Sequence, residues 1–116
     1  MKSVFKGDDV SRQAMTHPEV KLAYMKVLIG PDQGWNDHVM RQIELEAGGY
    51  SPKHAHPWPH INLILSGEGE IEIDGETIFV TPGDHAFIPA NTLHQFRNRG
   101  EDTFQFVCIV PVQGHQ

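Results

Sequence analysis

The chain is divided by turn-forming residues into short segments rich in β-branched and aromatic side chains. The clearest pair is residues 70–73 and 77–80, which flank Asp74-Gly75. An Asp-Gly pair between two such segments predicts a tight β-hairpin, because both central positions of a type I′ turn need positive φ. Similar segments follow at a spacing of about 8–12 residues, which is typical of an all-β barrel or sandwich. They are residues 20–29, 38–46, 60–65, 87–89, 94–97 and 103–112.

Composition excludes several classes of partner. The 116 residues carry a formal net charge of −6, and an acidic chain repels phosphate backbones, so we expect no nucleic-acid partner. No apolar run approaches the ~20 residues that a membrane span needs, so we expect no membrane partner. Cys108 is the single cysteine, and the resulting lack of an intrachain disulfide suits a reducing cytosol. We therefore expect one globular domain in the cytoplasm.

Three histidines, His54, His56 and His60, fall within seven residues, and His94 follows in a second segment bounded by turns. Imidazole is a strong ligand for transition metals. Two prolines inside the group exclude a helix, whereas spacings of two and four residues place side chains on one face of a strand. We therefore predict that these three histidines share a face and that all four bind one metal ion.

Other side chains are candidates for a substrate pocket around that metal. Alternation along residues 103–112 places Phe106 and Cys108 on one face; Cys108 could face the cavity or be a small buried core residue. Arg41 shares a face with apolar neighbours. It could hold a substrate carboxylate, pair with an acidic side chain, or reach water from an edge strand. Trp58 flanks the histidines and could shape the entrance or simply pack.

Two groups of residues resemble the two motifs of the cupin superfamily, in particular its small single-domain members. The spacings within both motifs are kept, and the two motifs cover residues 48–98. The resemblance extends over about residues 20–112. The first group is Gly48, His54-x-His56, His60 in the place where Glu normally stands, and Gly67. The second group is Gly83, Pro89-x-Asn91 with Asn91 in the place of Gly, His94 and Asn98.

The resemblance implies a fold and an assembly. The fold is a conical β-barrel of the double-stranded β-helix or jelly-roll type, with the metal inside, and the usual assembly is a homodimer. The barrel would cover residues 20–116, and residues 1–19 would be an N-terminal segment that could be exchanged between subunits. Histidine at position 60 is similar to a subgroup of small bacterial cupins with four histidine ligands, often associated with manganese.

Four neutral ligands would make the metal more electrophilic. A divalent ion keeps a site charge of about +2 instead of the about +1 that a Glu ligand would leave, so it attracts anions more strongly. On a metal that prefers six ligands, two positions stay open, for a bidentate substrate or for substrate and dioxygen. The all-imidazole set suits Mn, Fe, Co, Ni, Cu or Zn. The family favours Mn or Fe.

Three functions follow from this site. The leading expectation is an oxidoreductase of dioxygenase type that acts on a small organic substrate with dioxygen or peroxide. The alternatives are a redox-neutral metal-dependent isomerase or lyase, and a non-catalytic small-ligand-binding cupin. Activity retained with Zn would favour the redox-neutral enzyme, because Zn has no redox chemistry. Because each imidazole must be neutral to bind, we expect metal occupancy to fall below about pH 6.

Overall fold

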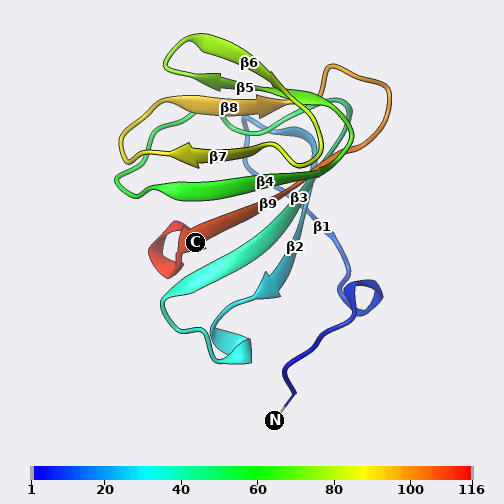
Figure 1. Cartoon of the computed structure of the whole chain (residues 1–116), viewed down its shortest axis with the longest axis vertical. Helices are drawn as coiled ribbons and strands as arrows, with labels where there is room; N and C mark the ends of the chain where they lie inside the picture. The colour runs from blue at the N-terminus through cyan, green and yellow to red at the C-terminus, as the bar shows by residue number, and fades with distance from the viewer. Residues whose placement is uncertain (1, 116) are drawn as a thin grey trace.

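Strands dominate the structure, a computed structural model that describes residues 2–115 (Figure 1). Over this range it contains nine strands and only single-turn 3-10 helices. The strands are β1 (Gln13–Ala14), β2 (Lys21–Ile29), β3 (His38–Tyr50), β4 (His60–Ser66), β5 (Gly69–Ile73), β6 (Glu76–Val80), β7 (His85–Ile88), β8 (His94–Arg97) and β9 (Phe104–Pro111). The 3-10 turns are η1 (Gly7–Asp9), η2 (Pro31–Gln33) and η3 (Val112–His115). The all-β expectation is confirmed.

The strands form one curled antiparallel sheet with the jelly-roll arrangement that was expected. Its order is β6-β5-β8-β3-β9-β4-β7, and β2 pairs with β3 outside this path. The last strand, β9, therefore lies between β3 and β4, which come far earlier in the chain. Its register pairs Cys108 with Arg41 on one side and with Asn62 on the other. This register brings three polar side chains from distant segments into one row across the inner face.

The core follows the predicted alternation. Along β9 every second residue is buried, beginning at Phe104 and including Cys108. The ring of Phe106 stacks on that of Phe96 from β8, with centroids 4.3 Å apart. Burying one such aromatic side chain contributes about 1.5–3 kcal/mol. This aromatic contact joins β8 and β9, which are separated by β3 in the order of the sheet.

The hairpin signal is confirmed, whereas two expected boundaries are wrong. Asp74 and Gly75 have φ of 49° and 83°, as a type I′ turn needs. The strand expected over residues 38–46 does not end there, because β3 continues to Tyr50. The strand that the histidine spacing suggested over residues 54–60 forms only from His60 onward; residues 51–59 lie outside the strands, with an isolated bridge between His54 and His94. Proline lacks the N–H that a ladder needs, and three prolines lie in this segment.

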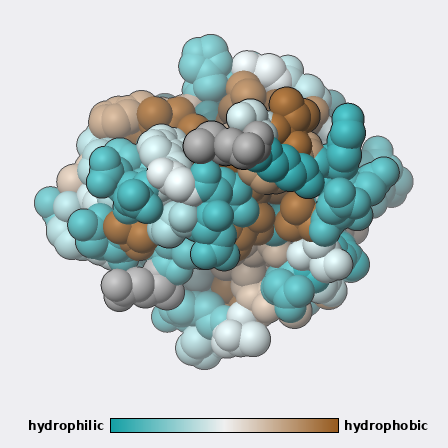
Figure 2. All heavy atoms as spheres, turned by 90° about the horizontal axis from the view of Figure 1, so that it is seen from below, coloured by the Kyte–Doolittle hydropathy of each residue, from teal (hydrophilic) through white to brown (hydrophobic). Residues whose placement is uncertain are grey.

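The N-terminal segment extends away from the barrel toward the lower end in Figure 1. Strand β1 pairs with β2 of the same chain, through Gln13–Met25 and Ala14–Tyr24. Exchange of this segment between subunits stays a prediction. Seen from that lower end, hydrophilic side chains are interspersed with smaller apolar groups (Figure 2). Among residues 2–115, no helix is long and apolar enough to cross a membrane.

Close packing against Phe104 leads to a stability prediction. A Cβ added at Gly69 would overlap the fully buried ring of Phe104. We expect Gly69→Ala to lower the free energy of unfolding by about 1–3 kcal/mol, because the core must shift to admit the methyl group. Urea unfolding measures this change. Gly7→Ala is the matched control, since a Cβ there meets nothing within 4 Å. Equal destabilisation of both variants would contradict the assignment.

Candidate metal centre

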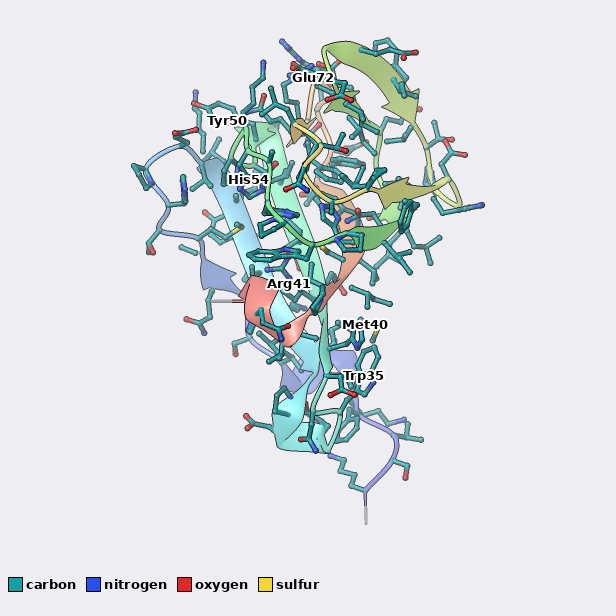
Figure 3. The ribbon with its side chains drawn as sticks, turned by 90° about the vertical axis from the view of Figure 1, so that its left-hand side faces the viewer. Trp35, Met40, Arg41, Tyr50, His54 and Glu72 are labelled. Carbon is teal, nitrogen blue, oxygen red and sulfur yellow. The ribbon has the colours of Figure 1, made fainter. Side chains whose placement is uncertain are left out.

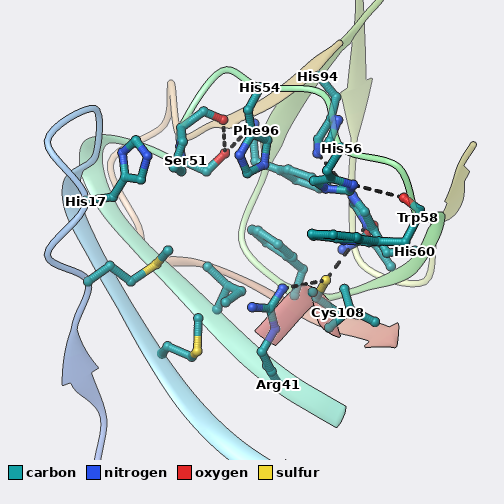
Figure 4. Close-up of a pocket in the computed structure, with 18 of the residues that line it drawn as sticks. His17, Arg41, Ser51, His54, His56, Trp58, His60, His94, Phe96 and Cys108 are labelled. Atoms are coloured by element: carbon teal, nitrogen blue, oxygen red, sulfur yellow. Dashed lines mark hydrogen bonds between the residues drawn. The ribbon is translucent and has the colours of Figure 1, made fainter. Parts of the chain in front are cut away.

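The four predicted histidines converge around one point in the barrel (Figure 4). One ligand atom from each of His54, His56 and His94 lies within 4.8 Å of the others. The ring of His60 joins this group, with its centroid 4.8 Å from that of His94 and 5.3 Å from that of His56. Two rings come from the loop before β4, and the others from the first residues of β4 and β8. Residues 40 positions apart in sequence thus form one cluster.

Backbone hydrogen bonds fix the irregular loop that carries His54 and His56. The N–H of His54 donates to the carbonyl of His94 (3.1 Å), and the N–H of His94 donates to the carbonyl of His54 (3.0 Å). The N–H of Asn91, which has a left-handed φ of 62°, donates to the carbonyl of His56 (2.7 Å). The loop is therefore held against the segment that leads into β8. This anchoring, rather than strand alternation, directs the rings inward.

Oxygen acceptors orient three of the four rings. In each, Nδ1 lies within hydrogen-bonding distance of an oxygen that can only accept, so Nδ1 carries the proton and Nε2 presents a lone pair. The acceptors are the Trp58 carbonyl for His56 (2.9 Å), the Asn62 amide oxygen for His60 (2.7 Å) and the Thr92 carbonyl for His94 (2.8 Å). The Asn62 amide nitrogen donates to the Val107 carbonyl, which assigns its oxygen to His60.

The distance between the two innermost nitrogens shows whether a cation fits between them. Nε2 of His60 and Nε2 of His94 are 3.0 Å apart. With both Nδ1 atoms protonated, two lone pairs face each other at this distance, and a cation between them removes the repulsion. Two nitrogens at right angles about an ion, each ~2.1 Å from it, would also be about 3.0 Å apart. The donor set therefore fits a divalent transition metal.

The pKa values of all four histidines in the cluster are lowered. Burial, followed by the neighbouring histidines, lowers the pKa of His54 to about 4. Burial also lowers the pKa of His94 to about 4, and the pKa values of His56 and His60 shift in the same direction mainly for the same reason. The expectation that occupancy falls below about pH 6 rested on an unperturbed imidazole. Proton competition at His54 and His94 therefore moves to more acidic pH.

The histidines line a cavity of about 650 Å³. Arg41, Trp58, Phe106 and Cys108, the four side chains predicted to surround the metal, all line it. Trp58 stacks on His56 with a centroid distance of 4.8 Å and an interplanar angle of 13°. Cys108 is buried and free. The cavity thus has aromatic walls close to the histidines and room for a small organic molecule.

Arg41 lies on the inner face of the barrel. Its surroundings bear on the three expected roles, namely holding a substrate carboxylate, pairing with an acidic side chain, or reaching water from an edge strand. Strand β3 is paired on both sides, so Arg41 is not on an edge. Its Nη2 donates to Sγ of Cys108 (3.3 Å), and that sulfur is 3.8 Å from Nδ1 of His60 (Figure 4). Its Nε is buried without a hydrogen-bond partner. Among the described residues, no ion pair joins Arg41 to a carboxylate.

The sequence analysis missed two contributors to this site. Asn62 is buried and orients His60. It shares the inner face of β4 with His60, so alternation along that strand could have identified it. Residues 13–17 also line the cavity, and no sequence pattern indicates this because the placement depends on how β1 pairs with β2.

The fold and the site together define an all-β barrel whose histidine cluster fits a divalent metal inside a small-molecule cavity. Residues 41–110, more than half of the chain, match the Cupin_2 family, described as the cupin domain. The chain belongs to this family. The match includes all four histidines of the cluster, so the motif resemblance and the structure agree on the family.

Three relatives illustrate the range of chemistry on this fold. The chain is 32% identical over 71 residues to 1-methylthio-D-xylulose 5-phosphate methylsulfurylase of Rhodospirillum rubrum, covering 61% of this chain and 46% of that protein. It is 38% identical over 66 residues to quercetin 2,3-dioxygenase of Bacillus subtilis, covering 53% of this chain and 20% of that protein. The chain thus spans less than half the length of these curated relatives. The solved structure of the polyketide cyclase RemF from Streptomyces resistomycificus is similar, with a TM-score of 0.89 and 27% identity, covering 96% of this chain and 80% of that one.

The lowered pKa values lead to a pH prediction for the metal-free protein. Unfolded histidines take up protons near pH 6.5, whereas His94 stays neutral in the fold until about pH 4. The unfolded state therefore binds more protons in this window, and the free energy of unfolding should fall as pH drops from about 6.5 to about 4.

Urea unfolding at a series of pH values measures that slope. We expect His94→Gln to make the slope shallower, because it removes one group that stays neutral only when folded. His85→Gln is the matched control, since His85 is an exposed histidine on β7 outside the cluster. Parallel pH profiles for wild type and His94→Gln would contradict the assignment.

Proposed function

We propose that the chain is a metal-dependent oxidoreductase of dioxygenase type that acts on a small organic substrate, with His54, His56, His60 and His94 as the metal ligands. The observation that carries this proposal is the opposed pair of lone pairs on His60 and His94, 3.0 Å apart inside a cavity. The likeness to quercetin 2,3-dioxygenase supports the reaction class. A reducing cytoplasm is the proposed compartment, because it would keep the thiol of Cys108 free.

Manganese or iron is the proposed metal, with Ni, Cu, Co and Zn as other ions that imidazole binds. A divalent Mn or Fe supplies Lewis acidity together with one-electron redox chemistry toward dioxygen or peroxide. Histidine at position 60, where other cupins have Glu, supports membership of the four-histidine subgroup. A ligand set without a carboxylate leaves the full charge of the ion to act on the substrate.

The chain's own residues would hold the substrate and keep water out. The stacked rings of Phe96 and Phe106 and the indole of Trp58 offer flat apolar walls to an unsaturated substrate. The amide oxygen of Asn62 accepts a hydrogen bond from Nδ1–H of His60, which keeps Nε2 of that ring unprotonated and directed at the ion. Neutral rings need no deprotonation before they bind a cation.

A redox-neutral isomerase or lyase is the second candidate. The likeness to a polyketide cyclase over 96% of this chain favours it. Such an enzyme needs a general base near the metal, and no Asp or Glu among the described residues lines the cavity. Among residues 2–115, the side chains lining the cavity that could serve as a base outside the metal cluster are His17 and Cys108. A non-catalytic ligand-binding cupin would bind small molecules without turnover and is the third possibility.

Metal retention tests the ligand set. We expect wild type to hold about one divalent ion per chain after gel filtration, and His60→Ala and His94→Ala to lose most of it, because each removes a ligand from the cluster. Elemental analysis by mass spectrometry measures the metal. His85→Ala is the matched control and should keep the ion. Retention of the ion by both cluster variants would contradict the assignment.

Oxygen uptake separates the first two functions. We expect protein loaded with Mn or Fe to consume dioxygen with at least one member of a panel of enolisable and unsaturated compounds, measured with an oxygen electrode. Protein loaded with Zn should consume none, because Zn does not change its oxidation state. Turnover of a substrate by the Zn form without oxygen uptake would instead support the redox-neutral enzyme.

We propose a homodimer that forms through the outer face of β4, β7 and β9. Ile61 of this face pairs in register with Phe87 on one side and with Ile109 on the other. Ile61, Leu63 and Phe87 are 52%, 42% and 63% exposed, so three large apolar side chains on adjacent strands face solvent in the single chain. Contiguous apolar patches of this kind are typical of protein–protein contacts.

Oligomeric state tests this face. We expect wild type to sediment as a dimer and Leu63→Glu to sediment as a monomer, because a carboxylate at the centre of the patch would be buried without a partner. Sedimentation equilibrium measures both masses. Phe79→Glu is the matched control: Phe79 is 76% exposed but lies on β6, outside the face, and should leave the dimer intact. A monomeric wild type would refute the proposed assembly.

A further inference from the structure

The cavity contains a cationic side chain that no described group neutralises. Arg41 is the only Lys or Arg among the described residues that line it, and no described Asp or Glu lines it at all. The sole hydrogen bond of its guanidinium is the weak one from Nη2 to Sγ of Cys108. The cavity is therefore locally cationic, although the whole chain carries a net charge of −6.

An arginine in this state is costly for the fold. A buried polar group without a partner destabilises the native state, and more so when it is charged. Only two buried side-chain nitrogen or oxygen atoms among residues 2–115 have no partner, namely Nε of Arg41 and Nδ1 of His115. Turn η3 carries His115 and strand β3 carries Arg41. Because η3 packs against β3, both nitrogens lie on one side of the barrel (Figure 3).

The position of Arg41 relates it to the metal centre. Sγ of Cys108 lies 3.3 Å from Nη2 of Arg41 and 3.8 Å from Nδ1 of His60. The guanidinium and the imidazoles thus face the same cavity, separated by one thiol, with Phe106 among the walls. A molecule that contacts Arg41 at one end can extend to the histidines at the other.

We propose that Arg41 forms an oxyanion-binding subsite that anchors a carboxylate or phosphate group of the substrate. The planar guanidinium matches either group with paired N–H donors, and the unpartnered Nε is one of the donors such a fork uses. The subsite restricts the substrate to small anions with an apolar, unsaturated body that packs on the aromatic walls. The other end of such a substrate would react at the histidines, and in this respect the inference rests on the function proposed above.

Anion binding to metal-free protein tests the subsite independently of the metal. We expect chelator-treated wild type to bind benzoate in isothermal titration calorimetry, and to bind benzamide, a neutral molecule of the same shape, at least about tenfold more weakly, because a charge-assisted hydrogen bond contributes about 1.5–3 kcal/mol. Phenyl phosphate is the second anion, and the ratio of its affinity to that of benzoate shows which oxyanion the subsite prefers.

Substitutions assign that binding to Arg41. Arg41→Gln should weaken benzoate binding at least about tenfold and abolish the preference over benzamide, while Arg41→Lys should restore part of both. Arg99→Gln is the matched control, because Arg99 is 65% exposed at its side chain and pairs with Glu70 outside the cavity. Equal benzoate binding by wild type and Arg41→Gln, or no anion binding by wild type, would overturn the proposal.

Stability separates an anchor from a structural arginine. We expect Arg41→Met to unfold at the same or a higher urea concentration than wild type without added anion, since it removes a partly buried guanidinium whose Nε has no partner. Benzoate should then stabilise wild type and not the variant. Lower stability of Arg41→Met in the absence of anion would mean that the arginine supports the fold and would overturn the subsite. These readouts need no metal, so failure of the oxidoreductase assignment leaves them unaffected.

Discussion

The reciprocal backbone bridge between His54 and His94 is the interaction on which the site depends. It joins a loop that prolines keep out of the sheet to the first residue of β8. Without it, His54 and His56 would belong to a free segment, and the entropy of ordering them would oppose metal binding. With it, the imidazole rings of two distant stretches are held around one point before an ion binds, so the site is preorganised.

A second constraint comes from the register of β9 between β3 and β4. Cys108 pairs with Arg41 and with Asn62, so a cation, a thiol and an amide lie side by side on the inner face. Asn62 sets the tautomer of His60, and Cys108 separates that ring from the guanidinium. A slip of β9 by one residue would turn Cys108 outward and break this row, because strand side chains alternate. The geometry of the cavity therefore follows from sheet pairing.

The interior collects groups that a purely structural core avoids. Opposed lone pairs, a guanidinium with an unpartnered Nε and a free thiol lie within one cavity, next to an apolar cluster of buried side chains. The opposed lone pairs and the unpartnered guanidinium reduce stability unless something binds, and such costs concentrate at functional sites. The aromatic packing of Phe96, Phe104 and Phe106 offsets them. The chain thus combines a rigid apolar base with a polar cavity that is incomplete without ligands.

The sequence by itself determined the all-β class, the Asp74-Gly75 hairpin and the four histidines, because turn chemistry, alternation and motif spacing are local properties. It put Arg41 on the same face as apolar neighbours but left its surroundings open. The strand spacing expected over residues 54–60 was wrong before His60, since the prolines keep that segment out of the sheet. Only the tertiary structure decided that Asn62 orients His60, that Arg41 lies opposite Cys108 and that the rings converge. Those facts depend on which strands pair and in what register, and pairing between distant segments leaves no local pattern to read.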